Sequence, residues 1–529
     1  MPWPELERVR LTGARIWTAD PAHPWAQSID LAQGRIVAVD APPREDTPTV
    51  HLDPAWTIVP GLIDAHLHLS LGAQSLAQVD LRGVRSRREF EERIAAGARA
   101  LEPGAWLRAF GWDEHAWGGE RPTREWLRAA GRTPAVAYRV DQHVCLVNDA
   151  VLERVGCASC PPGGEIVRDG SGAPTGLMVE QAAWQLVNPA IPAPSAQERQ
   201  RMLLRAMAHC NRFGLTAAGS MEYRVDLEQA HLPLRDARRD ACTLRVIATA
   251  LDRDWPVEYG WIARFPADDL LSIVGCKSFV DGTLGSRTAR MLAPYADAPQ
   301  TRGMFVEFAA HSPQRLRTWV RETLGHGLSP SMHAIGDEAL RTALDAAEHE
   351  DAARIVRFEH CQTLDDADLP RMAGRIASMQ PLHKHDDAAM APARLGAQRM
   401  RGFFRFRDLA DAGALLAFGS DWPIVSCDPR LGIRAAVTGL AADGSRCMPQ
   451  QNLRVEEALL AYTAGAAQAL RAPALGRIAP GAHADLCVFA GNPFAHDWES
   501  GLPEIAATVL GGRIVHAGVD AARPAARMR

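Results

Sequence analysis

The chain lacks a large excess of charge of either sign, and it lacks long apolar runs. Among its 529 residues, 58 Lys and Arg stand against 63 Asp and Glu, which gives a net charge of −5 at pH 7. No basic excess is present to neutralise a phosphate backbone, so we expect no nucleic-acid partner. No apolar stretch approaches the roughly 18 residues that a membrane span needs, so we expect no membrane partner.

A secretory leader and a regular cysteine framework are also missing. The first residues, MPWPELERVRLTG, contain no basic segment followed by an apolar one, which predicts a cytoplasmic location. The ten cysteines are scattered, which is typical of reduced thiols in a large chain. One CxxC pair, Cys157 and Cys160, precedes a Pro-Pro-Gly-Gly run. It forms either an incidental loop, which this run favours, or half of a metal site.

The overall amino-acid composition is typical of a folded enzyme. Hydrophobic residues make up 47% of the chain and charged residues 23%, values that exclude a disordered protein. Both ends contain short β-rich runs with Gly and Pro between them, such as GARIWTAD and GRIVAVD near the start and DLCVFAG and GGRIVHAG near the end. Neither end can form a stable sheet alone, so we expect one composite β-sandwich domain from residues 1–57 and 472–529.

Between these ends, over residues 58–471, apolar strand-like runs alternate with amphipathic helix-like stretches. The strand-like runs are TIVPGLIDAHLHL, GLTAAGS, LRVIATALD, LSIVGCKSFVDG, LSPSMHAIGD, RIVRFEHC, RIASMQP and ALLAFGSDWP. Eight strands with intervening helices predict an α/β protein built on a (β/α)8 barrel, in which catalytic groups lie at the carboxyl ends of the strands.

One connection is far longer than a βα unit requires. About residues 72–200 follow the first candidate strand, and they read as a large insertion. It contains five tryptophans: Trp106, Trp112, Trp117, Trp126 and Trp184. These aromatic side chains either line an apolar pocket in a segment that caps the barrel mouth or form the insertion's own core.

The clearest chemical signal is Asp64-Ala65-His66-Leu67-His68 at the end of an apolar run. Residues i and i+2 of a strand point to one face, so His66 and His68 can reach one metal ion together. Histidines also occur as ordinary core or surface residues, and an HxH pair alone leaves both readings open.

Three further groups of ligand type end later strands. They are His333 after LSPSM, His360 in RIVRFEH, and Asp421 in ALLAFGSD. Each lies where barrel strands present catalytic groups, and neutral imidazole with carboxylate is a common ligand set for zinc or a similar divalent ion. Their recurrence at successive strand ends favours a metal site over a set of unrelated core residues.

Lys277 lies in the apolar run LLSIVGCKSFVDG. An unpaired ammonium is costly to bury, so a lysine here needs a reason. It either extends to solvent or pairs with Asp281, or its neutral amine reacts with CO2 to form a carbamate that can bridge two metal ions.

Taken together, these residues resemble the binuclear subtype of the amidohydrolase superfamily, and more narrowly the amidohydrolase-3 family, with its N-substituted formamide deformylase-like and exoenzyme-regulator-like proteins. The resemblance covers nearly the whole chain. The matching segments are VPGLIDAHLHL, GGEIVRDGSGAPTGLMVE, CKSFVDGTLGSRTA, HAIGDEAL, EHCQ, SMQPLHKHDD, AFGSDWPI, ALLAYTAGAAQAL and IAPGAHADL.

The resemblance implies a role for each ligand position. Two divalent metal ions, with zinc expected, would be held by His66, His68, Lys277 as an N6-carboxylated bridge, His333, His360 and Asp421. Asp421 would ligate the first ion and act as general base toward a hydroxide that bridges the two metals.

The same resemblance points to substrate contacts. His143 matches a family histidine of the inserted segment, although Gln142 stands where the family more often has Gly. Asp281 is expected near the site, either as a hydrogen-bond acceptor for a metal ligand or a contact to the substrate, or as a simple turn carboxylate. Trp112 and Trp422 complete the predicted substrate-binding set.

The expected function is metal-dependent hydrolysis of an amide-type C–N bond in a small-molecule N-formyl or N-acyl amine, and a homodimer is compatible with it. The alternatives are a mononuclear deaminase of a ring amidine and a non-catalytic scaffold on the same fold. The bridging lysine argues against the deaminase, and the complete ligand set argues against the scaffold.

Overall fold

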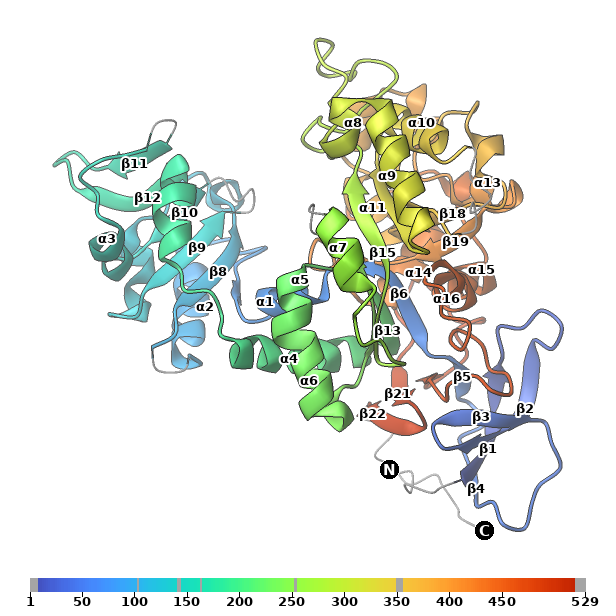
Figure 1. Ribbon diagram of the computed structural model, residues 1–529. Coiled ribbons are helices and arrows are strands. Elements are labelled where there is room, and N and C mark those ends of the chain that lie inside the picture. Colours follow the sequence, from blue (N-terminus) through green and yellow to red (C-terminus); the bar gives the residue numbers. More distant parts are fainter. Residues whose placement is uncertain are drawn as a thin grey trace. The chain divides into compact units, whose positions relative to one another are not determined.

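The structure is a computed structural model that describes residues 8–101, 104–139, 144–161, 164–251, 255–348 and 355–518. The chain divides into two compact units, one of Met1–Gly72 with Leu203–Arg529 and the other of Ala73–Met202 (Figure 1). Among the described helices, none combines the length and the apolar character that crossing a membrane requires.

Eight parallel strands of the first unit form a single sheet in which neighbours follow chain order. Nearly all of their residues are buried, because one face lies inside the barrel and the other under helices. The strands are β6 (Leu62–Leu67), β13 (Leu215–Glu222), β14 (Arg245–Ala250), β15 (Leu271–Phe279), β16 (Ser329–Ala334), β17 (Arg357–His360), β18 (Ile376–Met379) and β19 (Leu415–Phe418).

Backbone hydrogen bonds close the ring between the last strand and the first. The N–H groups of Ser420 and Asp421, just after β19, donate to His66 O over 3.2 and 2.6 Å, and His68 N–H donates to Trp422 O over 2.8 Å. Gly419 permits this approach, since a Cβ there would lie 2.5 Å from His66 N. This closure brings the segment after β19 against His66, near the end of β6, and His68, just after it.

Helices in the connections cover the barrel. In α9 (Pro313–Gly325) the Ser312 side chain accepts from Arg315 N–H at the start, and Leu316, Trp319 and Val320 form a buried stripe at helical spacing. The other helices of these connections are α1 (Leu69–Ser75), α4 (Ala196–Asn211), α5 (Arg224–Asp226), α6 (Leu232–Ala237), α7 (Trp255–Ile262), α8 (Glu307–His311), α10 (Asp337–Ala346), α11 (Pro381–Asp387), α12 (Ala391–Leu395), α13 (Phe406–Asp411), α14 (Pro429–Thr438), α15 (Val455–Ala461) and α16 (Ala464–Ala469).

A second eight-stranded sheet combines strands from both ends of the chain. Its strands are β1 (Arg8–Trp17), β2 (Trp25–Ala32), β3 (Arg35–Val39), β4 (Thr49–His51), β5 (Thr57–Pro60), β20 (Leu486–Phe489), β21 (Ile505–Leu510) and β22 (Arg513–Ala517). The two ends meet where β5 pairs antiparallel with β20, with Ile58 opposite Val488. Strands from both ends contribute to one apolar core, because each end alone has too few strands to cover its hydrophobic face.

The second unit, Ala73–Met202, contains a six-stranded sheet with strand order β11-β12-β10-β9-β8-β7. Its elements are β7 (Val79–Asp80), α2 (Arg87–Arg99), β8 (Leu107–Trp112), β9 (Ala135–Arg139), β10 (Val144–Val147), α3 (Asp149–Val155), β11 (Gly164–Arg168) and β12 (Pro174–Glu180). The expected α/β fold is therefore confirmed, with a barrel, a β-domain from both ends and an insertion after the first barrel strand.

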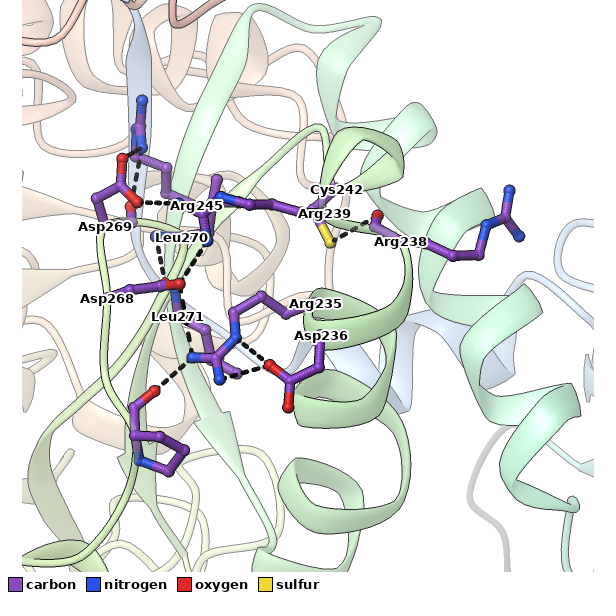
Figure 2. A network of polar contacts seen from close by, with 11 residues as sticks. Arg235, Asp236, Arg238, Arg239, Cys242, Arg245, Asp268, Asp269, Leu270 and Leu271 are labelled. Atoms are coloured by element: carbon purple, nitrogen blue, oxygen red, sulfur yellow. Dashed lines mark hydrogen bonds and ion pairs between the residues drawn. The ribbon is translucent and has the colours of Figure 1, made fainter.

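A network of arginines and aspartates holds the start of β15 (Figure 2). Asp268 Oδ1 accepts from the N–H groups of Leu270 and Leu271 over 2.9 Å, and Arg245 donates to Asp269 Oδ2 over 3.1 Å. Arg245 also donates to Asp485 Oδ2 over 2.7 Å. Because Asp485 directly precedes β20, this buried pair ties barrel strand β14 to the composite sheet.

Candidate metal centre

His66 and His68 lie together at the carboxyl end of β6. Their Nε2 atoms are 3.4 and 3.1 Å from Asp421 Oδ1. One ligand atom from each of the three residues lies within 4.8 Å of the other two, close enough to hold one ion. The alternation of the strand brings the two imidazoles to one side, and the closed ring adds the carboxylate.

Asp421 has an unusual backbone conformation, with a φ of 60°. The left-handed region is costly for a residue with a Cβ, and the hydrogen bonds to His66 O hold it there. Burial alone would raise the pKa of the Asp421 carboxyl, but hydrogen bonds with His66 and His68 hold it well below its ordinary value. The group is therefore an anion, as both a metal ligand and a proton acceptor require.

A second group of ligand atoms shares the same carboxylate. His360, His383 and Asp421 each place one ligand atom within 4.8 Å of the other two. Among the residues described, His360 Nδ1 and His383 Nε2 have no hydrogen-bond partner although both atoms are buried. Burial lowers the pKa of His360 well below its ordinary value, which keeps the imidazole neutral. The neutral His360 imidazole, the two buried ring nitrogens without a hydrogen-bond partner among the described residues, and the anionic carboxylate together fit a divalent cation.

Glu359 sets the orientation of His66. Its Oε2 lies 2.7 Å from His66 Nδ1, and its Oε1 lies 3.0 Å from Nε of the fully buried Arg357. Burial alone would raise the pKa of Glu359, but Arg357 and His66 hold it well below the ordinary range. An ionised Glu359 can only accept, so His66 donates its Nδ1–H to it, and this bond directs His66 Nε2 toward Asp421.

Lys277 is buried on β15 close to these groups. Burial lowers its pKa to about 8, an effect that the charges of Glu359 and Asp421 only partly oppose. Within the described ranges no carboxylate forms an ion pair with it, and its Nζ lies 5.1 Å from the centre of the Phe279 ring. The only other lysine in the sequence is Lys384, so the chain keeps one of its two lysines in an apolar barrel strand.

His333 and Asp281 lie beside His360. The ring centres of His333 and His360 are 4.4 Å apart, and His333 Nε2 is 3.0 Å from Gly282 O. Burial, and then the charge of Lys277, lowers the pKa of His333 to about 3, so this imidazole is neutral. Asp281 Oδ1 lies 3.7 Å from His333 Nε2.

The Asp281 carboxylate also organises its own loop. It accepts backbone N–H bonds from Ile335 over 3.0 Å and from Gly336 and Arg290 over 2.8 Å each. Burial, despite these bonds, raises the pKa of Asp281 to about 7. Most of the hydrogen bonds of Asp281 are therefore those of a turn carboxylate, one of the roles that the sequence left open. The carboxylate also lies close to His333, as a role near the site requires.

The remaining predicted residues are not part of the ligand groups. Trp422 is buried and stacks on His209 at a centroid distance of 5.6 Å. Trp112 is 1% exposed in the core of the second unit, where its Nε1 donates to Ala137 O over 2.9 Å. His143 lies outside the described residues. Cys157 and Cys160 are free thiols, and the described part of the chain places neither in a metal-binding group.

Sequence reasoning missed His383 and Glu359. His383 belongs to the segment SMQPLHKHDD, but it follows the end of β18 by several residues and lies on α11, so a search at strand ends passes over it. Glu359 directly precedes His360, and its pairing with His66 spans 293 positions in the sequence. The available signal for Glu359 was its position directly before a predicted ligand, in the strand-like run RIVRFEHC.

The comparison with known families decides what kind of protein carries this site. The model of the amidohydrolase family matches residues 57–516. The chain belongs to the amidohydrolase family. The match covers the barrel, the insertion and four of the eight strands of the composite sheet, β5 and β20–β22, and it confirms the resemblance seen in the sequence.

Relatives within the amidohydrolase family cover most of the chain. Protein LONG AFTER FAR-RED 3 of Arabidopsis thaliana is 32% identical over 94% of this chain and 89% of its own length. The putative amidohydrolase YtcJ of Bacillus subtilis is 33% identical over 86% and 88%. N-substituted formamide deformylase of Arthrobacter pascens is 25% identical over 92% and 94%.

A solved structure supports the same conclusion. An uncharacterized metal-dependent hydrolase from Pyrococcus horikoshii superposes with a TM-score of 0.77 and 27% identity, over 93% of this chain and 99% of that one. The protein is thus a hydrolase of the metal-dependent amidohydrolase family.

Proposed function

We propose that this amidohydrolase cleaves the C–N bond of a small-molecule N-formyl or N-acyl amine and uses two divalent ions, with zinc expected. The observation that carries the proposal is that two histidine groups share the Asp421 carboxylate beside a buried lysine for which the described residues provide no ion-pair partner. Shared carboxylate ligation suits two ions a few ångströms apart. The 25% identical N-substituted formamide deformylase supports the substrate class.

Each ion has its own set of protein ligands in this proposal. His66 and His68 would hold the first, and His360 with His383 or the adjacent His333 would hold the second. Lys277 Nζ would react with CO2, forming a carbamate and releasing a proton, and the carbamate would replace the costly buried cation with an anion able to ligate both ions. When bound, the ions make a water molecule acidic at neutral pH and polarise the substrate carbonyl.

Asp421 moves the proton. Its ionised carboxylate accepts a proton as water oxygen bonds to the carbonyl carbon, and it delivers that proton to the nitrogen as the C–N bond breaks. The nitrogen then leaves as a neutral amine rather than as an unstable amide anion.

Metal analysis and a substrate panel test the proposed reaction. Protein purified without chelators should contain two ions per chain and hydrolyse members of a panel of N-formyl, N-acetyl and N-acyl-amino-acid compounds. About one ion per chain, with turnover of ring amidines and no turnover of amides, would replace the proposal with the mononuclear deaminase.

The scarcity of lysine allows a direct test of the carbamate. Protein exchanged into ¹³C-bicarbonate should give one carbamate carbon resonance, which disappears in Lys277→Ala and remains in Lys384→Met. Lys384 is the matched control, because burial lowers its pKa to about 8 as well while its Nζ lies 3.5 Å from Met448 O. Lys277→Ala should lose most metal and activity, with partial rescue by formate or acetate; full activity without rescue contradicts a bridging role.

A further inference from the structure

Gln380 carries a buried carboxamide that nothing described in the chain satisfies. The residue is fully buried, and neither its Nε2 nor its Oε1 has a hydrogen-bond partner among the described residues. Burying an amide without partners is costly, and most buried polar side chains in folded proteins have them. The amide nitrogen, a donor, and the amide oxygen, an acceptor, thus both lack a partner among the described residues.

Local structure does not explain these open groups. Gln380 stands at the N-cap of α11, but its side chain makes no capping hydrogen bond. Two other buried glutamines of the barrel are satisfied: Gln362 Nε2 donates to Asp387 Oδ2 over 2.5 Å, and Gln451 Oε1 accepts from Asp408 N–H over 3.2 Å. The unpaired carboxamide is therefore particular to Gln380.

The position of Gln380 is beside the ligand groups. Ser378, two residues earlier on β18, receives a 3.3 Å hydrogen bond from the buried Arg357, so this face of the strand points into the barrel. Ser378 is level with Glu359 on β17, and Gly419 N–H donates to Met379 O over 3.0 Å. Gln380 thus lies at the carboxyl-end rim between the strand that ends in His360 and the one that leads to Asp421.

We infer that the Gln380 carboxamide binds the amide group of the substrate, and that it makes the enzyme selective for secondary amides. This inference rests on the proposed amide hydrolysis. A secondary amide can donate its N–H to Oε1 and so gives this open acceptor a partner. A tertiary amide or an ester has no N–H, so it leaves Oε1 buried without a partner.

Kinetics on matched substrates test the inference. Wild-type enzyme should prefer an N-alkylformamide over its N-methylated tertiary counterpart, and Gln380→Met should reduce this ratio of kcat/KM values by about 100-fold. Gln362→Met removes a buried glutamine that already has a partner, so it should lower stability and leave the ratio unchanged. An unchanged ratio in Gln380→Met overturns the inference.

A binding measurement separates this inference from the proposed reaction. N-butylmethanesulfonamide resists hydrolysis and keeps an acceptor oxygen and an N–H, whereas its N-methyl derivative lacks the N–H. Calorimetry should show tighter binding of the first compound to wild-type protein and equal binding of the two to Gln380→Met. Equal binding to wild type overturns the role of Gln380 even if amides are hydrolysed, and absence of amide turnover overturns the proposed reaction alone.

Thermal unfolding gives a third readout. Because Gln380 has no hydrogen-bond partner among the residues that the structure describes, Gln380→Met should unfold at the same temperature as wild type or higher. A lower Tm together with an unchanged substrate ratio would assign Gln380 a purely structural role and overturn the inference.

Discussion

At the scale of single residues, the chemistry of the site depends on partners that set the protonation of each ligand. Asp421 stays ionised because the adjacent His66 and His68 side chains hold its pKa well below the ordinary value. His360 stays neutral because it is buried. Glu359 fixes which nitrogen of His66 faces the shared carboxylate. Each of these states is the one that a divalent ion requires of its ligand.

Glu359→Gln should weaken metal binding by about 10- to 100-fold, because a neutral amide no longer fixes the His66 ring or its basicity. A chelator-competition titration of folded protein measures the effect. Glu457→Gln is the matched control, since Glu457 also pairs with an arginine, Arg407, but contacts no ligand group. Equal metal affinities in wild type and Glu359→Gln would contradict the orienting role.

His483 makes stability depend on pH. Burial, and then the charge of Arg245, lowers its pKa to about 4, against an ordinary value of about 6.5. As pH falls from about 6.5 to 4, the unfolded chain therefore binds a proton that the folded chain does not, and stability decreases.

His483→Gln should remove this part of the acid sensitivity, on the order of 2 kcal/mol between pH 7 and pH 4.5. Urea unfolding of wild type and His483→Gln at pH 7 and pH 4.5 measures how much stability each protein loses on acidification. The difference between the two losses isolates the effect of His483, because the effects of all other groups cancel. The prediction fails if the two proteins lose the same stability on acidification.

At the scale of elements, the site depends on how β6 and the segment after β19 are held together. Helix α1 begins directly after His68, and it packs against Trp422, which directly follows Asp421. A Cβ on Gly72 of this helix would lie 2.1 Å from a ring carbon of Trp422. This close approach couples the positions of His68 and Asp421.

Gly72→Ala should therefore destabilise the protein by about 1–3 kcal/mol and reduce metal content, although Ala is the better helix former. Gly260→Ala in α7 is the control, because a Cβ at that position would have Arg264 Nη1 as its nearest neighbour, at 3.7 Å. That variant should be neutral or slightly stabilising. Chemical unfolding and metal analysis of both variants check the prediction, and a stabilised Gly72→Ala would contradict it.

At the scale of the whole molecule, the barrel and the composite sheet are joined by charged as well as apolar contacts. Arg245 at the start of β14 donates to both oxygens of Asp485, over 2.7 and 3.1 Å, and both side chains are buried. Arg239, in the same network, is half-exposed and pairs with Asp268 and Asp269 (Figure 2). The network thus contains a buried pair and an exposed one side by side.

Arg245→Met should cost about 3–5 kcal/mol of stability, because it leaves the Asp485 carboxylate buried without its cation. Arg239→Met should cost less than about 1 kcal/mol, because exposed ion pairs contribute little. Thermal and urea unfolding of the two variants provide the comparison. Similar losses in both would show that the buried pair does not join the two parts of the fold.

Much of the fold and part of the site were predictable from sequence. The barrel strands, the two-ended β-domain and the position of the insertion follow from local periodicity and turn residues, and the structure confirms them. His66 and His68 were found because alternation along one strand is a local property. His383 was missed because its approach to Asp421 depends on where α11 begins, which no short-range pattern specifies.

The sequence by itself determined the family, the barrel and the ligand types at its strand ends, because these depend on residues near one another in the chain. Only the tertiary structure decided that two histidine groups share Asp421, that Glu359 orients His66, that Trp112 packs in a core and that Gln380 is left without a partner among the described residues. The physical reason is closure of the barrel: the hydrogen bonds between β6 and the segment after β19 bring together side chains that are hundreds of positions apart.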